Sequence, residues 1–392
     1  MRLSRRAFVR GFAAPPSAFS SAVWSIGARG REAGPWEQHG SAPAAVQDGI
    51  YINSNENPLG PGQAALAAIE ASFADAGRYP MNARPALADL SALIAKAYSA
   101  KPENVLLGNG SGELLRGAVR AFTSRDRPLV TAAPSFELPH RTAELIGVPV
   151  KAVRVDSAGR LDLDVMAAAA RGAGLVFLCN PNNPTATVHG ASAIRDFVTR
   201  VRRDSADTAI LLDEAYHDYV TEPSYATGAP LALEGPHVFV TRTFSKAYGM
   251  AGLRVGYAVG QTETIKALGR YLMPFNVNVP ALAAASTSFQ DAAHIQRERD
   301  RNTEVRRFTM NVLRNAGAQP TESQANFLFV DIRRPAREFR EACQKHGVMI
   351  GREFPPLDKT HVRISLGTME EMRRATQVFA KLLGSAVHSS AL

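Results

Sequence analysis

The sequence predicts an α/β protein: a large domain with a mainly parallel seven-stranded sheet, followed by a smaller C-terminal α+β domain. Seven short runs are rich in apolar and β-branched residues, at positions 105–107, 129–132, 149–155, 175–179, 209–212, 237–240 and 255–259. Helical patterns separate several of these runs, as crossover connections between parallel strands require. Most runs are apolar throughout, which is typical of strands buried on both faces. The 392 residues, 45% of them hydrophobic, suffice for one large domain and a smaller one.

The first ten residues resemble a twin-arginine export signal, with Arg5 and Arg6 as the arginine pair and Arg10 at the usual lysine position. Residues 11–28 carry no charge but are too weakly apolar to span a membrane. We therefore expect export by the twin-arginine machinery, to the periplasm or beyond. The alternatives are a disordered basic tail or a wrongly chosen start codon, and either would leave the protein in the cytoplasm.

Composition shifts along the chain suggest four regions. Residues 1–47 are the signal and a Gly-, Pro- and Ala-rich linker, and residues 48–77 are an N-terminal arm with a helix at 63–73. The large domain is expected at 78–280 and the small domain at 281–392. A helical pattern over 280–316 is expected to lead into the small domain. There, strands are predicted at 326–332, 348–350 and 362–366, and helices near 335–346 and 369–383.

Charge and cysteine content exclude several classes of function. The formal net charge is +9, yet no basic stripe interleaved with aromatic residues and no nucleic-acid motif is present. We therefore expect no nucleic-acid partner. The two cysteines, Cys179 and Cys343, cannot form a disulfide framework. No CxxC or HExxH motif occurs, so no metal site is predicted.

The most informative segment, residues 241–254, directly follows the sixth predicted strand. It places Thr243, Ser245, Lys246 and Arg254 within twelve residues. The two hydroxyls and the guanidinium can hold a phosphate dianion, Arg254 through its planar fork. Lys246 can then reach an aldehyde and form a Schiff base. Taken alone, the segment could equally be a solvated basic loop.

Three further polar segments follow predicted strands, where ligands of open α/β sheets bind. Gly110, Ser111 and Gly112 open a helix, and small residues there let main-chain N–H groups approach a phosphate. Asn183 lies in a proline-rich turn. Asp213 ends a buried strand, where a carboxylate is costly without a cationic partner such as a protonated pyridine nitrogen. An isolated aspartate at this place could instead cap a helix.

In this order, the motifs resemble those of class I/II pyridoxal-phosphate (PLP) aminotransferases of fold type I, and most of all the histidinol-phosphate aminotransferases. The resemblance covers about residues 50–383 and rests on the segments at 245–254, 180–186 and 213–216. It departs from the family at Ala186, where glycine is usual, and at Gly112, where an acidic residue is usual. The departure at Gly112 concerns a side-chain contact and leaves the main-chain phosphate cradle intact.

The resemblance implies roles for individual residues. Lys246 would bind PLP, Asp213 would keep the pyridine nitrogen protonated, and Phe136 would stack on the ring. Asn183 and Tyr216 would contact its phenolic oxygen. The remaining cofactor contacts implied are Gly110, Ser111, Gly112, Thr243, Ser245, Arg254 and, from the partner subunit of a homodimer, Tyr79.

For the substrate, the resemblance implies Asn326 and Arg363, with Arg363 gripping an α-carboxylate through its fork. Arg352 matches an arginine that meets the distal phosphate in histidinol-phosphate aminotransferases. The residues that follow it, 353–356, differ from the commoner pattern. Arg352 could instead assist Arg363 or pair with Glu353 at the surface.

The expected reaction moves an amino group from an amino acid, or an amino-alcohol phosphate, to a 2-oxo acid, with Lys246 carrying a proton at the substrate Cα. A lyase on the same scaffold, such as a threonine-phosphate decarboxylase, would share every cofactor residue. A non-catalytic exported binding protein is the second alternative. The pair Lys246 and Asp213 argues against it, because binding alone needs neither a Schiff base nor a protonated ring.

Overall fold

The computed structural model describes residues 49–388, so the expected export signal and linker at 1–47 lie outside the described residues. The main sheet has seven strands in the order β2-β8-β7-β6-β5-β3-β4. The strands are β2 (Val105–Gly108), β3 (Leu129–Ala133), β4 (Val150–Arg154), β5 (Leu175–Cys179), β6 (Ala209–Asp213), β7 (Val238–Thr243) and β8 (Gly256–Gly260). All seven predicted strands are confirmed: β5 has the predicted ends, and the ends of the others differ by at most three residues.

The sheet is mainly parallel, as predicted, and only β8 runs against its neighbours. Strand β8 pairs antiparallel with both β7 and β2, whereas the pairs β3–β4, β3–β5, β5–β6 and β6–β7 are parallel. A parallel return would need a long crossover, but β7 and β8 are joined only by residues 244–255. That short loop carries Ser245, Lys246 and Arg254.

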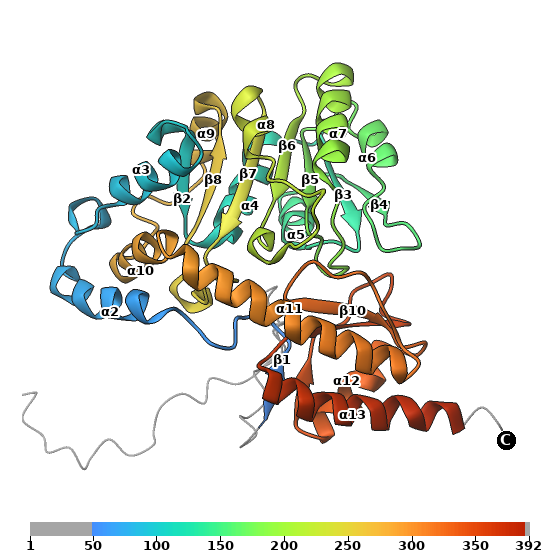
Figure 1. Cartoon of the computed structure of the whole chain (residues 1–392). Coiled ribbons are helices and arrows are strands. Elements are labelled where there is room, and N and C mark those ends of the chain that lie inside the picture. The colour runs from blue at the N-terminus through green and yellow to red at the C-terminus, as the bar shows by residue number, and fades with distance from the viewer. Residues whose placement is uncertain (1–48, 389–392) are drawn as a thin grey trace, which may run out of the picture. The chain divides into compact units, whose positions relative to one another are not determined.

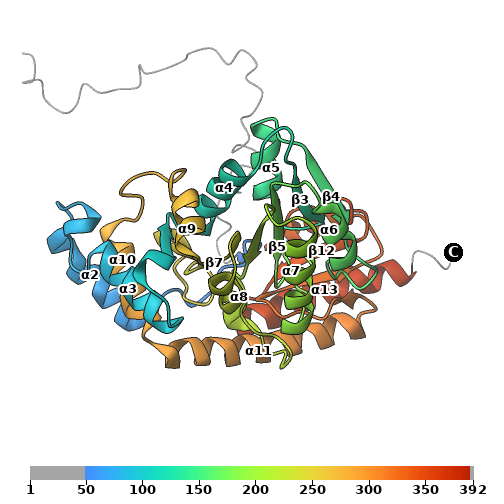
Figure 2. The same cartoon turned by 90° about the horizontal axis from the view of Figure 1, so that it is seen from above.

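Helices cover both faces of this sheet, because alternate side chains of each strand point to opposite faces (Figures 1 and 2). Phe177, Leu211 and Phe239 belong to one apolar cluster, together with residues of α4 (Gly110–Phe122), α5 (Leu138–Leu145) and α9 (Thr262–Gly269). Val176, Leu178 and Val240 belong to another, with α6 (Leu163–Ala169), α7 (Ala191–Asp204) and α8 (Ala229–Glu234). The sheet therefore contributes to two separate cores.

A third apolar cluster lies at the edge formed by β2 and β8. It joins residues of α2 (Gln63–Ser72), α3 (Leu87–Ala97) and α10 (Val279–Phe289) to Leu107 and Tyr257. The helical pattern at 280–316 is two helices rather than one. The second, α11 (Ala292–Asn315), begins anew because Asp291 accepts a hydrogen bond from the main-chain N–H of His294 as its N-cap.

The C-terminal part has its own core around two small sheets. An antiparallel sheet contains β9 (Gln319–Pro320), β10 (Phe327–Asp331) and β12 (His361–Ser365), and α12 (Ala336–Lys345) and α13 (Met369–His388) pack nearby. The second sheet is a parallel pair of β11 (Val348–Ile350) and β1 (Ile50–Ile52). No strand is predicted at 50–52. The pairing of β1 with β11, about 300 residues later in the chain, could therefore not be predicted from the sequence.

Short 3₁₀ turns complete the chain at η2 (Phe73–Asp75), η3 (Pro80–Asn82), η4 (Pro102–Asn104), η5 (His217–Tyr219) and η6 (Ala251–Leu253). Within the described range, no helix combines the length and apolar character needed to cross a membrane.

Candidate functional site

The β7–β8 loop brings three of the predicted residues into one hydrogen-bonded cluster. Thr243, the last residue of β7, donates from Oγ1 to Oγ of Ser245 at 2.9 Å, and Arg254 donates from Nη1 to the same oxygen at 3.2 Å. Arg254 also donates to the carbonyl of Ala251 at 2.8 Å. Two hydroxyls and a guanidinium therefore converge within a stretch of twelve residues.

The N-terminus of α4 lies directly against this cluster. Gly110 has φ +69°, and a Cβ atom there would collide with Nη2 of Arg254. A Cβ atom on Gly256 would lie 2.5 Å from the main-chain nitrogen of Ser111. Both glycines are thus required for the close approach of helix end, strand and arginine. A helix N-terminus beside hydroxyls and a guanidinium is a favourable anion site.

Asp213, at the end of β6, is a buried carboxylate with little compensation. It is 2% exposed, and its Oδ1 accepts from Thr241 Oγ1 at 2.9 Å, with the thiol of Cys179 3.8 Å from Oδ2. Burial raises the pKa of Asp213 to about 7. Among the described residues no basic side chain forms an ion pair with it. The adjacent Glu214 differs, because Arg242 donates to its Oε2 from both Nε and Nη2.

Asn183 and Tyr216, both predicted to contact the cofactor's phenolic oxygen, are hydrogen-bonded to each other, and a third residue joins them. The hydroxyl of Tyr216 accepts from Nδ2 of Asn55 at 3.1 Å and from Nδ2 of Asn183 at 3.4 Å. Burial raises the pKa of this hydroxyl. The sequence analysis does not single out Asn55, although it lies in the Asn- and Pro-rich arm at 51–60.

Lys246 faces the same group of side chains. Its Nζ donates to the carbonyl of Ser54 at 3.3 Å and lies 5.8 Å from the ring centroid of Tyr216. Burial, followed by the positive charge of Arg363, lowers the pKa of Lys246 to about 8, while Glu56 acts to raise it. An amine in these surroundings gives up its proton far more readily than an exposed lysine.

Arg363, on β12, reaches across from the small domain. It donates from Nη1 to Oδ1 of Asn183 at 2.9 Å and from Nη2 to the carbonyl of Asn53 at 2.7 Å. Its Nε is buried and has no hydrogen-bond partner among the described residues. Burial lowers the pKa of Arg363 to about 10. An unsatisfied buried donor of this kind is what a bound anion would complete.

The arm that carries Asn53 and Asn55 is held down by the small domain. Ser365 donates from Oγ to Oδ1 of Asn55 and accepts from its main-chain N–H, both at 2.8 Å. Asn326, predicted to bind substrate, is fully buried, and its Nδ2 donates to the carbonyls of Asn55 and Glu56. Asn326 therefore fixes the arm, and direct contact with a substrate stays a prediction.

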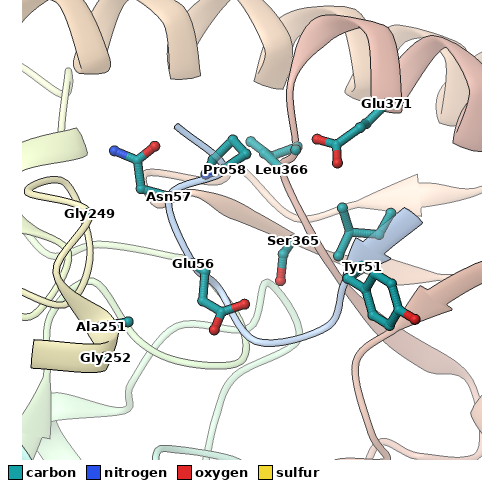
Figure 3. A pocket seen from close by; sticks show the side chains of 12 residues that line it. Tyr51, Glu56, Asn57, Pro58, Gly249, Ala251, Gly252, Ser365, Leu366 and Glu371 are labelled. Atoms are coloured by element: carbon teal, nitrogen blue, oxygen red, sulfur yellow. The ribbon is translucent and has the colours of Figure 1, made fainter. Parts of the chain in front are cut away.

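A cavity of about 370 Å³ lies where the arm, the loop at 249–252 and the end of β12 face one another (Figure 3). Glu56 extends into it from the arm, and Ser365 and Leu366 line it from the small domain. The negative charge of Glu56 acts to raise the pKa of Lys246, whose Nζ bonds to the same arm at the carbonyl of Ser54. No role is predicted for Glu56 from the sequence.

Arg352 does not pair with the side chain of Glu353, so that alternative is wrong. Its Nη2 donates to Oε1 of Glu137, and its Nη1 donates to the main-chain carbonyl of Glu353 at 3.0 Å. The carboxylate of Glu353 instead faces Arg337 and Arg340, at 3.6 and 3.3 Å. The predicted stacking residue Phe136 lines a smaller cavity together with Arg352.

Tyr79 lies away from these residues. Its side chain is 65% exposed, and its ring packs against Phe275 with centroids 4.8 Å apart. Its predicted contact with a partner subunit cannot occur within one chain and stays a prediction.

Comparisons with known proteins agree with this arrangement. Residues 47–379 match the family model described as aminotransferase class I and II. The chain is 37% identical over 342 residues to a histidinol-phosphate aminotransferase of Moorella thermoacetica, covering 86% of this chain and 85% of the relative. It is 35% identical to one of Symbiobacterium thermophilum, covering 86% and 92%.

A solved structure is also similar. It is the histidinol-phosphate aminotransferase of Sinorhizobium meliloti in complex with pyridoxal-5'-phosphate, which superposes with a TM-score of 0.79 at 26% identity. The match covers 93% of this chain and 99% of that one.

Proposed function

The chain belongs to the class I and II aminotransferases, and from this membership and the site geometry we propose how its own residues carry out amino transfer. It is a PLP-dependent enzyme that moves an amino group from a small-molecule donor to a 2-oxo acid. The observation that carries the residue assignment is the buried Asp213, which has no ion-pair partner among the described residues and whose pKa is raised by burial and lowered, to a smaller extent, by the charge of Lys246.

The residues present fit the cofactor on two counts. Thr243, Ser245, Arg254 and the helix end at Gly110 form an anion site without an acidic side chain bonded to it. Nearby, the buried Asp213 would be stabilised by a cationic ring nitrogen, which would reverse its raised pKa. A phosphate and a basic ring nitrogen on one molecule satisfy both needs.

When bound, PLP supplies an aldehyde that takes up the amino group and a ring that delocalises the electron pair left at the substrate Cα. The protein residues bind, orient and move protons. Lys246, with a pKa of about 8, can accept a proton at Nζ and return it. The buried Asp213 would hold negative charge next to a cationic ring nitrogen. Arg363 offers its unpartnered Nε to the donor's carboxylate.

A direct test mixes the purified, PLP-loaded protein with an amino donor and an isotope-labelled 2-oxo acid. The expected products are the labelled amino acid and the 2-oxo acid of the donor, in equal amounts. Release of CO₂ and an amine, without a labelled amino acid, would instead identify the lyase alternative.

We also propose a homodimer with Tyr79 serving the partner's site. Its ring neighbour Phe275 is exposed, and so are Phe73, Met81 and Met273, which lie within eight residues of one or the other along the chain, at 48–73%. A stable monomer rarely exposes such a group. Mixing Lys246→Ala and Tyr79→Ala subunits at limiting PLP should produce activity that neither variant shows alone. A monomer by light scattering would contradict the proposal.

Export by the twin-arginine route is supported by residues 4–10 alone. A fusion of residues 1–47 to a reporter that works only outside the cytoplasm should be active. The reporter activity should vanish when Arg5→Lys and Arg6→Lys are combined. Lysine keeps the positive charges but removes the two consecutive arginines that define the signal. Unchanged activity would refute dependence on that route.

A further inference from the structure

The guanidinium of Arg352 is already occupied by groups of this chain. Arg352 follows β11, and its Nη2 donates to Glu137, the residue before α5, with which it forms an ion pair. Its Nη1 donates to the carbonyl of Glu353 at 3.0 Å. Bidentate binding of a phosphate or carboxylate uses two nitrogens of the fork. Both terminal nitrogens of Arg352 therefore have acceptors before any substrate arrives.

An aromatic ring fixes the plane of the same guanidinium. Cζ of Arg352 lies 4.2 Å from the ring centroid of Phe354, and Cζ of Arg363 lies 4.8 Å from that centroid. Phe354 is 2% exposed and packs edge-on against Phe329. Turning Arg352 toward a ligand would lose both the stacking and the ion pair.

Arg352 forms its ion pair with Glu137 and not with Glu353. The carboxylate of Glu353 faces α12. Glu353 lies 3.3 Å from Arg340 and 3.6 Å from Arg337. The departure from the commoner family pattern at 353–356 thus has a structural counterpart. In this segment, Phe354 stacks on the guanidinium of Arg352. The carboxylate of Glu353 points away and does not compete with Glu137 for Arg352.

This pair lines a cavity of about 170 Å³. Its other walls include the apolar Pro134, Phe136, Phe354 and Pro355, together with His140 and the exposed Arg141. The ring centroid of Phe354 lies 4.8 Å from Cζ of Arg363, so the cavity adjoins the expected carboxylate site. A second anion on the donor would meet the carboxylate of Glu137 at Arg352 or have to displace it. An uncharged group would leave the pair intact.

We propose that Glu137 is a specificity-determining residue: by holding Arg352, it makes the site select donors with an uncharged far end over donors with a phosphate or carboxylate there. The proposal rests on the aminotransferase activity proposed above and names the chemical class of the donor for that same site. It assigns no change in the chemical step.

The test compares matched donors on the PLP-loaded enzyme. Glutamine and glutamate share their shape and α-carboxylate and differ in one charge at the far end, and asparagine and aspartate form a second pair. In the wild type, the uncharged member of each pair should have the higher kcat/KM. Glu137→Gln frees Arg352 and should raise kcat/KM for the anionic members on the order of ten- to a hundredfold. The uncharged members should change by about fivefold or less.

Two further variants separate local from general effects. Glu263→Gln makes the same charge change on α9, where Glu263 is 85% exposed and pairs with Lys266, and should leave both ratios unchanged. Arg352→Gln leaves Glu137 unpaired and should improve lysine, a donor with a cationic far end, relative to glutamine. This variant tests the charge of Glu137 independently of whether Glu137→Gln folds.

Preference of the wild type for glutamate and aspartate would overturn the proposal. So would a Glu137→Gln variant that behaves like Glu263→Gln. Transfer from none of these donors would instead refute the aminotransferase activity itself, because the uncharged members would fail as well.

Discussion

The anion site at the end of the main sheet and the substrate side next to it are built in different ways. In the anion site, Thr243 and Ser245 are 2 residues apart, and Arg254 bonds to Ser245 from 9 residues away. On the substrate side, Arg363 bonds to Asn183 across 180 residues and to Asn53 across 310. The pair of Arg352 and Glu137 spans 215.

This difference separates what is fixed locally from what depends on the assembled fold. The anion site needs one loop and the helix end beside it, so its parts are in place once the sheet forms. The substrate side needs the arm, the large domain and the small domain to meet. We therefore expect mutations in the first region to change cofactor binding or chemistry, and mutations in the second to change the choice and affinity of donors.

Lys246→Ala should give the largest effect, a loss of turnover of about 10²–10⁴-fold from general acid–base catalysis alone. The purified wild type should be yellow, and the variant should lose the absorbance of lysine-bound cofactor. Peptide mapping after borohydride treatment checks this. Labelled cofactor attached to another lysine of the variant would break the assignment.

Asp213→Asn should retain PLP but lose about 10²–10³-fold in kcat, because the variant removes the negative charge placed next to the ring. Turnover and cofactor content are measured on the same sample. Cys179→Ala, which removes only the neighbouring thiol, is the control. Near-normal turnover of Asp213→Asn would show that the carboxylate has no ionic role toward the cofactor.

Arg363→Gln tests the other region. Loss of charge-assisted hydrogen bonds should raise KM for donors with an α-carboxylate roughly ten- to a hundredfold. Cofactor affinity, measured by titration of the apoprotein, should stay close to that of the wild type. Equal losses of donor and cofactor binding would show that the two regions are not separable.

Gly110→Ala should weaken cofactor binding about tenfold. The positive φ costs roughly 1–2 kcal/mol for a residue with a Cβ atom, and that atom would push Arg254 away. Gly112→Ala is the matched control, since its Cβ atom would only touch Leu138 at 3.4 Å. Similar affinities for the two variants would argue against the close approach of Arg254 and the helix end.

The smallest expected effect concerns the stability of the apoprotein. The pKa of Asp213 rises from 3.8 to about 7 on folding, so the unfolded chain releases this proton first and stability falls as pH rises between these values. Asp213→Asn should remove this pH-dependent loss of stability. Its free energy of unfolding at pH 8 should exceed that of the wild type by about 1–2 kcal/mol, a figure that allows for hydration of Asp213 in the apoprotein. Denaturant melts at pH 4 and 8 measure it. A difference that does not grow with pH would contradict the raised pKa.

The same contrast explains what could be predicted from the sequence. Lys246, Arg254, Asp213 and Asn183 follow strands that could be recognised from continuous apolar runs, so the expected sheet already placed them at one edge. The pyridoxal-phosphate cofactor and the fold were predicted correctly for that reason. The predicted roles of individual residues remain to be tested.

Residues whose position depends on distant contacts could not be assigned. Asn55 reaches Tyr216 only because Ser365 and Asn326 hold the arm, and no local pattern encodes that meeting. The partner of Arg352 was misjudged because the neighbouring Glu353 offered a carboxylate. The structure directs that carboxylate to α12 and brings Glu137 in from another element.

The pairing of β1 with β11 has a consequence for synthesis of the protein. Ile50 leaves the ribosome early in synthesis, yet its main-chain partner next to Val348 is made almost 300 residues later. The main sheet can form while translation continues, but β1 and the arm after it must wait. A chain that stops before residue 348 therefore keeps its N-terminal segment undocked, and completion of the active site coincides with completion of the polypeptide.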